Sequence, residues 1–237
     1  MRFFLLLLAV LMPAAHAAAA PTPFSAEYEV FQNDKKLGRG TITLRALPNG
    51  QWEMVTRSEA TEGLVAAAGV SRSERSLLAW RDGKPEVVEY RMQQKAAWSE
   101  RSLLLQVDAA TRSARSTYKD KTTPLPYRPG MLDRHGLTAA IMSDLAAGGG
   151  AGAGKELRYA VASRDGVDEQ RYAVAAAVKL TTAVGVLRAV RVERIREGGG
   201  GRETKLWFAR ERGWLPLRIK QYEADGETLD MRIIAIR

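Results

Sequence analysis

The feature that most constrains this chain is an alternation of apolar and polar side chains in short segments. Between residues 24 and 30 every second residue is apolar, and Ser25, Glu27 and Glu29 lie between them. Successive side chains of a β-strand point to opposite faces, so this period predicts strands with one apolar and one polar face. The same alternation recurs over residues 40–45, 52–56, 217–220 and 229–233.

Turn signals separate these segments. Asn49-Gly50 is a strong hairpin signal, and further turns are expected at residues 33–36, 82–83, 164–166, 198–201 and 225–226. Hairpins are predicted to pair residues 71–80 with 85–93 and residues 186–196 with 203–209. Turns roughly every 8 to 12 residues favour a sandwich, barrel or half-barrel over a βαβ fold. We therefore predict a mainly β protein, an antiparallel meander forming a curved sheet, half-barrel or barrel, in a single domain over residues 21–237.

One segment departs from this pattern and predicts a short helix over residues 133–145. Asp133 is placed to accept backbone N–H groups at the start of the helix, where they have no partner within it. One face of the helix then carries the apolar residues Leu137, Ala140, Ile141 and Leu145. Gly148 ends the helix, and the glycine-rich residues 148–154 are expected to form a loop.

The first twenty residues have the three parts of a signal peptide. Arg2 supplies a short basic region, Phe3–Met12 are an apolar run of ten residues, and Ala15-His16-Ala17 is a small-x-small cleavage motif. A membrane-spanning helix needs about 20 apolar residues, so this run is too short to span. We therefore expect residues 1–17 to be removed as a signal peptide, with cleavage as late as residue 20, and no membrane-spanning segment in the remaining chain.

The amino-acid composition limits where in the cell the protein can work and what it can bind. The chain has no cysteine, which excludes both a lipid-modified lipoprotein and structural disulfides. Its formal net charge is +9, and an exported protein of this charge is expected to meet anionic lipids or glycans rather than nucleic acid. The cations are spread along the chain rather than clustered, so a solvated basic surface that aids solubility is the preferred interpretation of the charge. We predict a periplasmic protein whose partner is a lipid or another envelope component, and its oligomeric state stays open.

Residue types that carry chemistry are sparse. His135 is the single histidine after residue 20, and a Ser–His–Asp arrangement would combine it with Asp133 or Asp144 and with Ser143. No G-x-S-x-G motif accompanies these residues, so a histidine beside a capping aspartate is the preferred interpretation. One histidine and no cysteine argue against zinc. We predict no catalytic residues, no metal site and no cofactor.

An unusually polar strand is predicted over residues 71–76. Arg72, Glu74 and Ser76 are expected to share a face with Leu78. Such a polar row on an otherwise apolar face can line a wet groove, or it can form a cross-strand ion-pair ladder. The five tryptophans can likewise form a ligand-binding wall, although aromatic residues in strands more often belong to the core.

Several short motifs occur in an order that resembles a known family. They are Phe24–Val30 with Leu37-Gly38, Arg57–Ala60 with Ser73–Ser76, Leu132–Arg134 with Asp144-Leu145, Thr182–Gly185, and Trp207-Phe208 with Trp214–Arg218. The chain is thereby similar to an exported proteobacterial family catalogued as domain of unknown function 3108. The resemblance covers nearly all of residues 21–237 and departs from the family pattern at residues 148–154. It implies a half-barrel of the lipoprotein-carrier type, in which a curved sheet and a helix enclose an apolar cavity, and it assigns no activity.

Together these features favour a non-enzymatic binding protein whose apolar cleft holds an acyl chain or another apolar group. The helix is expected near the mouth of the cleft, and basic residues at the rim would neutralise an anionic headgroup. The candidate ligand-binding residues are Arg72, Glu74, Arg75, Asp133, Arg191 and Trp207. Two alternatives stay open. One is a structural or interaction module of the cell envelope that binds a protein or glycan, and the other is an envelope hydrolase with Asp133, His135 or Glu74 in one cleft.

Overall fold

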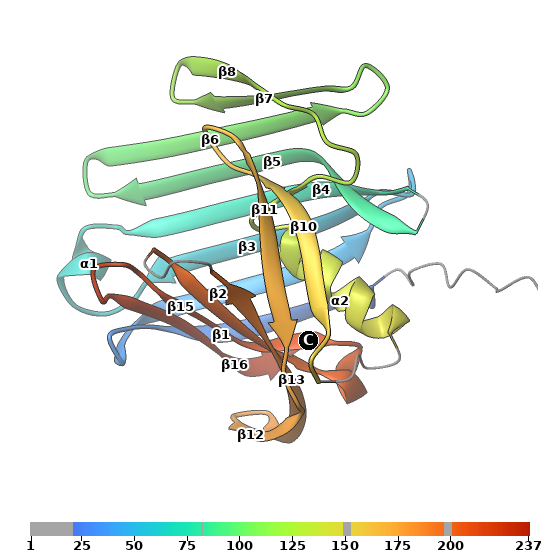
Figure 1. Ribbon diagram of the computed structural model, residues 1–237. Helices are drawn as coiled ribbons and strands as arrows, with labels where there is room; N and C mark the ends of the chain where they lie inside the picture. The colour runs from blue at the N-terminus through green and yellow to red at the C-terminus, as the bar shows by residue number, and fades with distance from the viewer. Residues whose placement is uncertain (1–20, 82, 149–152, 197–200) are drawn as a thin grey trace, which may run out of the picture.

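One large curved sheet dominates the computed structural model, which describes residues 21–81, 83–148, 153–196 and 201–237 (Figure 1). The first half of the chain forms β1 (Phe24–Gln32), β2 (Lys35–Ala46), β3 (Trp52–Ala60), β4 (Ser71–Arg81), β5 (Lys84–Ala96), β6 (Ser99–Asp108), β7 (Ser113–Tyr118) and β8 (Lys121–Leu125). The second half forms β9 (Leu132–Asp133), β10 (Glu156–Ala162), β11 (Val167–Val174), β12 (Val178–Thr182), β13 (Gly185–Ile195), β14 (Glu203–Ala209), β15 (Leu215–Tyr222) and β16 (Thr228–Ile236). The helical segments are α1 (Gly63–Ala67), α2 (Leu137–Ala147) and the 3-10 turn η1 (Arg210–Arg212). The predicted signal peptide lies outside the described residues.

The strands follow a meander that continues through the chain ends. Their order is β8-β7-β6-β5-β4-β3-β2-β1-β16-β15-β14-β13-β11-β10-β9, with β12 paired to β13. The last strand, β16, pairs antiparallel with the first, β1, which joins the two halves of the sheet. Among the described strands only β9 and β10 pair in parallel. The order ends at β8 and β9, so the sheet is an unclosed half-barrel, and the prediction of a mainly β, antiparallel, curved sheet is confirmed.

The predicted hairpins are found, but the sequence analysis missed five strands, the short strands β9 and β12 among them. Residues 71–80 and 85–93 lie in β4 and β5, and residues 203–209 form β14. The other three unpredicted strands are β6, β7 and β8, which extend one half of the sheet. Register shifts interrupt the pairing in four places, at Glu27/Tyr28, Val30/Phe31, Leu77/Leu78 and Trp207/Phe208. An extra residue at such a bulge bends its strand and increases the local twist, which helps the sheet to curve.

Helix α2 fills part of the concave face of the sheet. It begins at Leu137 rather than at Asp133, because Asp133 belongs to β9 and the turn between them is not helical. Eight of its eleven residues are buried, including Thr138 and Ser143 on faces that the sequence analysis left exposed. A helix covered on most sides by a curved sheet needs small or apolar residues all round. Helix α2 lies behind β10 within the half-barrel (Figure 1), and Thr138 in its first turn lines the cavity described below, so its predicted position near the mouth of a cleft stays a prediction.

The hairpin β10–β11 crosses the open side of the half-barrel and reaches the opposite half of the sheet (Figure 1). At its tip the backbone oxygen of Arg164 accepts a hydrogen bond from the Ser116 hydroxyl on β7, at 2.5 Å. The guanidinium of Arg164 lies 4.8 Å from the ring centroid of Tyr118, also on β7. Side chains thus bring the two halves together where backbone pairing does not.

Candidate ligand-binding cavity

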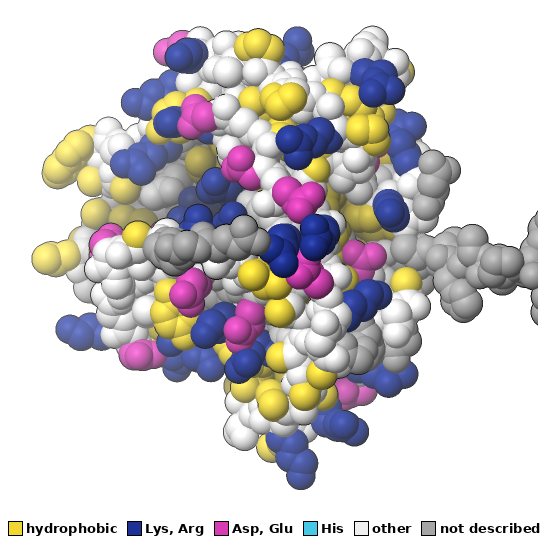
Figure 2. All heavy atoms as spheres, in the orientation of Figure 1, with side chains coloured by type: hydrophobic (Ala, Val, Ile, Leu, Met, Phe, Trp, Pro, Cys, Tyr) yellow, Lys and Arg dark blue, Asp and Glu magenta, His cyan; other side chains and the backbone are white. Residues whose placement is uncertain are grey.

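A cavity of about 540 Å³ lies between the concave face of the sheet and the β10–β11 hairpin. Its walls come from β2–β7, from the turn before α2 and the first turn of α2, from the β10–β11 hairpin, from Arg202 just before β14, and from β15 and β16. Figure 2 shows Lys and Arg side chains gathered within the hollow on the left half of the molecule. This volume is within the range of about 300–1,000 Å³ that is common for small-molecule sites.

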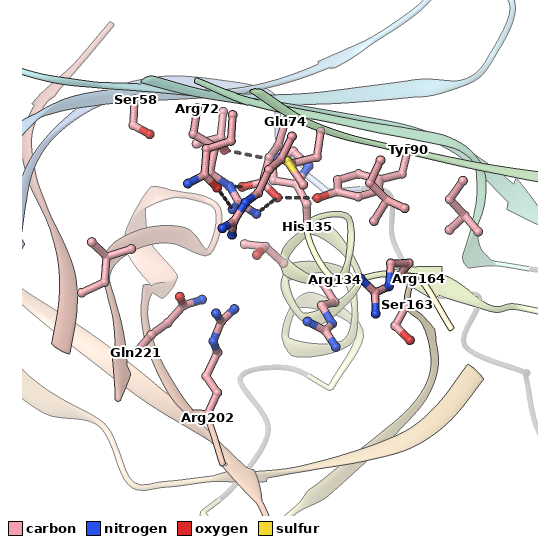
Figure 3. Close-up of a pocket in the computed structure, with 18 of the residues that line it drawn as sticks. Ser58, Arg72, Glu74, Tyr90, Arg134, His135, Ser163, Arg164, Arg202 and Gln221 are labelled. Carbon is pink, nitrogen blue, oxygen red and sulfur yellow. Dashed lines mark hydrogen bonds and ion pairs between the residues drawn. The ribbon is translucent and has the colours of Figure 1, made fainter. Parts of the chain in front are cut away.

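An ion pair on β4 forms the polar floor of the cavity (Figure 3). Arg72 donates two hydrogen bonds to Glu74, from Nε to Oε2 at 2.9 Å and from Nη2 to Oε1 at 3.0 Å. The Tyr90 hydroxyl on β5 donates to the same Oε1 at 2.5 Å. Burial alone would raise the pKa of Glu74, but the hydrogen bonds and the charge of Arg72 outweigh it and lower that pKa to about 2. Glu74 is therefore a fixed carboxylate that orients Arg72.

Behind this floor, a buried chain of hydrogen bonds ties the turn before α2 to the sheet. Oδ1 of Asp133 accepts the backbone N–H groups of His135 and Gly136 and the hydroxyl of Ser76, each at 2.8 Å. Ser76 thereby uses its one proton, so Nδ1 of His135, 2.8 Å away, donates to Ser76 Oγ. Nε2 of His135 lies 2.9 Å from the Thr56 hydroxyl on β3. This arrangement fixes the position of His135 in the cavity wall.

Asp133 itself is not in the cavity wall. Its side chain is buried, and burial raises its pKa. Oδ2 has no hydrogen-bond partner among the described residues. A Cβ added at Gly136 would lie only 2.7 Å from this Oδ2 and 2.9 Å from Leu78 Cδ2, so the turn requires glycine for space. Asp133 is a structural anchor for the turn that carries Arg134 and His135.

Four further arginines line the cavity besides Arg72. Arg164 and Arg202 have acidic partners, Asp165 at 2.9 Å and Glu223 at 2.6 Å. Arg101 and Arg134 have no ion pair with any described residue. Figure 3 shows Arg134 and Arg202 across the hollow from Arg72 and Glu74. The lining therefore carries excess positive charge, which favours an anionic group within it.

The cavity also has apolar walls that face each other across the half-barrel. Leu103 and Leu105 on β6, with Met92 on β5, line one side. On β15 and β16 the cross-strand pair Ile219 and Met231 lines the other side. The cavity thus combines apolar surface with cations, the combination that an amphiphilic anion requires. The sequence analysis missed the arginines on turns and the β6 leucines, and the only signal for the latter was the apolar run at residues 103–105.

The six predicted ligand-binding residues separate into two groups. Arg72 and Glu74 line the cavity, as the alternation along β4 predicted. Arg75 points to the convex face, where its Nε lies 2.6 Å from Glu53 Oε1. Arg191 pairs with Glu193, and the ring of Trp207 lies under Arg218 at 5.1 Å, so neither residue is in the cavity wall. Asp133 supports the wall from behind.

None of the five tryptophans lines this cavity. Trp207 and Trp214 are buried, Trp52 and Trp80 pack on each other with ring centroids 5.7 Å apart, and Trp98 is fully exposed. The core interpretation therefore holds for Trp207 and Trp214 and fails for Trp98.

The acidic and basic groups near His135 are already engaged with one another. Glu74 and His135 do lie in one cavity, with Asp133 behind them. However, Glu74 holds Arg72 and Tyr90, and both ring nitrogens of His135 are within hydrogen-bond distance of hydroxyl groups. Ser76 is fully buried, and Asp144 accepts a hydrogen bond from Tyr159 at 2.6 Å. This geometry is suited to holding a wall in place.

Two absences concern only the part of the chain that the structure describes. No three His, Asp or Glu side chains of the described residues converge in a way that would hold a metal ion. Among the same residues, no helix has both the length and the apolar character required to cross a membrane.

The fold is similar to that of a solved protein of unknown function. The crystal structure of a β-barrel-like protein of domain of unknown function DUF1849 from Brucella abortus superimposes with a TM-score of 0.59. The alignment covers 92% of this chain and 98% of that chain at 10% sequence identity, so the likeness concerns the fold alone. No curated protein is significantly similar to this chain.

A family match accounts for almost all of the described domain. Residues 27–233 match the family described as "Protein of unknown function (DUF3108)". The match begins in β1 and ends in β16, so it includes both halves of the sheet, α2 and the cavity. This chain belongs to the DUF3108 family.

Proposed function

We propose that this protein is an exported, non-enzymatic binding protein of the periplasm that holds an anionic amphiphile, such as an acyl-chain lipid, in the cavity. The observation that carries the proposal is the pairing of apolar walls with two arginines that lack acidic partners among the described residues, Arg101 and Arg134. Both arginines are solvent-exposed and have no acidic partner among the described residues, so their positive charge favours an anionic ligand group beside them.

Different parts of the cavity wall would contact the apolar and the anionic parts of such a ligand. Apolar parts would contact Met92, Leu103 and Ile219, where burial contributes roughly 0.8 kcal/mol for each CH₂ group. The anionic part would accept hydrogen bonds from Arg101 and Arg134. Arg72 is a third cation in the cavity wall. Its two hydrogen bonds to Glu74 hold its side chain in a fixed orientation.

The test measures both binding and its dependence on charge. The mature protein, purified without denaturant, is examined by native mass spectrometry, and the affinity for a fluorescent fatty acid is then measured. We expect a lipid-sized adduct, and about tenfold weaker binding in the R101Q/R134Q variant. The matched control R75Q/R191Q removes the same charge from arginines outside the cavity and should bind as the parent protein does. Absence of both adduct and saturable binding would reject the proposal.

Export is tested separately. The full chain is expressed in a Gram-negative host, and the periplasmic fraction is analysed by intact-mass measurement. We expect the first residue of the product to be Ala18, because Ala15-His16-Ala17 fits the cleavage motif, or a later residue up to Pro21. A full-length product confined to the cytoplasm would contradict export without affecting the binding measurement.

A further inference from the structure

Two large apolar side chains project into solvent at one end of the half-barrel. Trp98, at the tip of the β5–β6 hairpin, is 100% exposed, and Leu64 on α1 is 89% exposed. The two segments touch, because Ala97 N donates a hydrogen bond to Ala68 O at 2.8 Å. Figure 2 shows apolar side chains projecting from the left edge of the molecule, where Figure 1 places α1 and this hairpin.

The turn that carries Trp98 contains residues that do not favour its backbone conformation. β5 ends at Ala96 and β6 begins at Ser99, so Ala97 and Trp98 form a two-residue turn. Of the two turn residues only Ala97 has a positive φ, and a two-residue hairpin turn of that kind favours glycine at its first position. Ala97 has a φ of 50°, which disfavours an L-residue other than glycine, asparagine or aspartate. An exposed indole at this tip gains no burial in return, and local choices that lower stability are expected at functional sites.

This end of the molecule is also where the cavity opens. Gln94 and Arg101 are a cross-strand pair that lines the cavity, and Arg101 is two residues from the start of β6. Each member of the pair is three residues from the tip residues Ala97 and Trp98, so at about 3.4 Å per residue the pair lies about 10 Å from the hairpin tip. Ser58, two residues before the end of β3 and close to α1, also lines the cavity. Trp98 and Leu64 therefore flank one rim of the opening.

We propose that Trp98 and Leu64 dock this end of the protein on an anionic lipid surface. Protruding side chains suit a fluid lipid layer, which closes around them, whereas a protein partner would need preformed pockets for both. Tryptophan is favoured at the membrane–water interface because its ring is apolar and its N–H is polar. The inference goes beyond the proposed function, because docking does not require a ligand in the cavity.

Charge supports a lipid surface that is anionic. Arg39, Arg57 and Lys95 are exposed on the neighbouring convex face and have no ion pair with any described residue. Glu59, Glu62 and Glu100 lie among them and balance these three charges, so there is no local excess of positive charge. The attraction to an anionic surface therefore comes from the whole chain, whose formal charge is +9 before Arg2 is removed with the signal peptide. Binding should be weak and reversible, and salt should reduce it.

The experiment measures sedimentation of the mature protein with vesicles of phosphatidylethanolamine and phosphatidylglycerol. The L64S/W98S variant should bind about a hundredfold more weakly than the parent, about tenfold for each side chain removed from the lipid. The matched control V178S/V186S removes two exposed valines, 46% and 62% accessible, from the β12–β13 hairpin and should bind unchanged. Neutral phosphatidylcholine vesicles should bind the parent less than the anionic vesicles do.

Several outcomes would overturn the docking proposal. They are vesicle binding that L64S/W98S leaves unchanged, no vesicle binding by the parent, and equal loss in V178S/V186S. Stable capture of one envelope protein through Trp98, without vesicle binding, would also overturn it in favour of a protein partner. Fatty-acid binding to the cavity is measured in the absence of vesicles, so failure of docking is distinguished from failure of the proposed ligand site.

Discussion

The two faces of β4 carry similar ion pairs in different surroundings. On the concave face, Arg72 makes two hydrogen bonds to Glu74, which also accepts one from Tyr90. On the convex face, Glu53 accepts hydrogen bonds from Arg75 and Arg45, each at 2.6 Å. The concave cluster faces a cavity that holds other cations, whereas in the convex cluster Glu53 is buried beneath two arginines that reach bulk solvent. The same residue types can therefore serve recognition on one face and sheet stability on the other.

The first and largest test of this comparison removes one carboxylate from each face. E74A leaves Arg72 and the Tyr90 hydroxyl without their partner, and we expect a loss of about 2–3 kcal/mol in the free energy of unfolding. This is below the value for a fully buried pair because the Arg72 side chain is 41% exposed. E53A orphans no hydroxyl group and leaves Arg75 with Glu89 as a second partner, so about 1 kcal/mol is expected. Urea denaturation of both variants measures the difference, and equal losses would remove the distinction between the faces.

The second test acts on the buried support of the concave face. D133A removes the acceptor of two backbone N–H groups and of the Ser76 hydroxyl, and about 2 kcal/mol of stability should be lost. D133N keeps an oxygen acceptor and avoids a buried charge, so it should cost less than about 1 kcal/mol. Thermal and urea unfolding compare the two variants. If D133N were as damaging as D133A, the negative charge rather than the acceptor would hold the turn.

The concave face was only partly predictable from the sequence. Alternation along β4 placed Arg72, Glu74 and Ser76 together because a strand's side-chain period is local. The partners that complete the cavity depend on distant contacts. Ser76 and Asp133 are 57 positions apart, and Arg134 is brought in by that contact. The apolar run Leu103-Leu104-Leu105 hides the period-two signal of β6, so the wall that it forms could not be predicted from alternation.

The pH dependence of stability gives the third test. Glu74 has a pKa of about 2 in the folded protein and an ordinary value of about 4.3 when unfolded. Its contribution is therefore complete above about pH 5 and is lost as the pH falls toward 2, because the unfolded chain binds the proton first. We expect this group to account for about 1.5 kcal/mol of lost stability between pH 5 and pH 3.

The E74Q variant isolates that contribution. Its free energy of unfolding should fall less steeply than that of the parent over the same pH range, measured by urea denaturation at each pH. D34N, which removes a carboxylate that is 73% exposed and does not line the cavity, should leave the slope unchanged. Parallel curves for E74Q and the parent would show that Glu74 titrates as an ordinary exposed glutamate.

The smallest effect is expected on the convex face, from R75Q. Arg75 pairs with Glu53 at 2.6 Å and with Glu89 at 3.5 Å, and its side chain is 37% exposed. Solvent screens such a pair, and Arg45 still neutralises Glu53, so we expect a loss of about 0.5 kcal/mol. Because the Debye length shortens from about 10 Å at 0.1 M salt to about 3 Å at 1 M, the loss should nearly disappear in 1 M NaCl.

Urea denaturation at both salt concentrations measures the loss of stability in R75Q, and R72Q is the corresponding variant on the concave face. R72Q should remain destabilising in 1 M NaCl because it removes two hydrogen bonds from Glu74, and salt does not screen the loss of hydrogen bonds as it screens a charge pair. If salt removed the two losses equally, the cavity would screen charge as well as bulk water does, and the electrostatic basis for an anionic ligand would be lost with it.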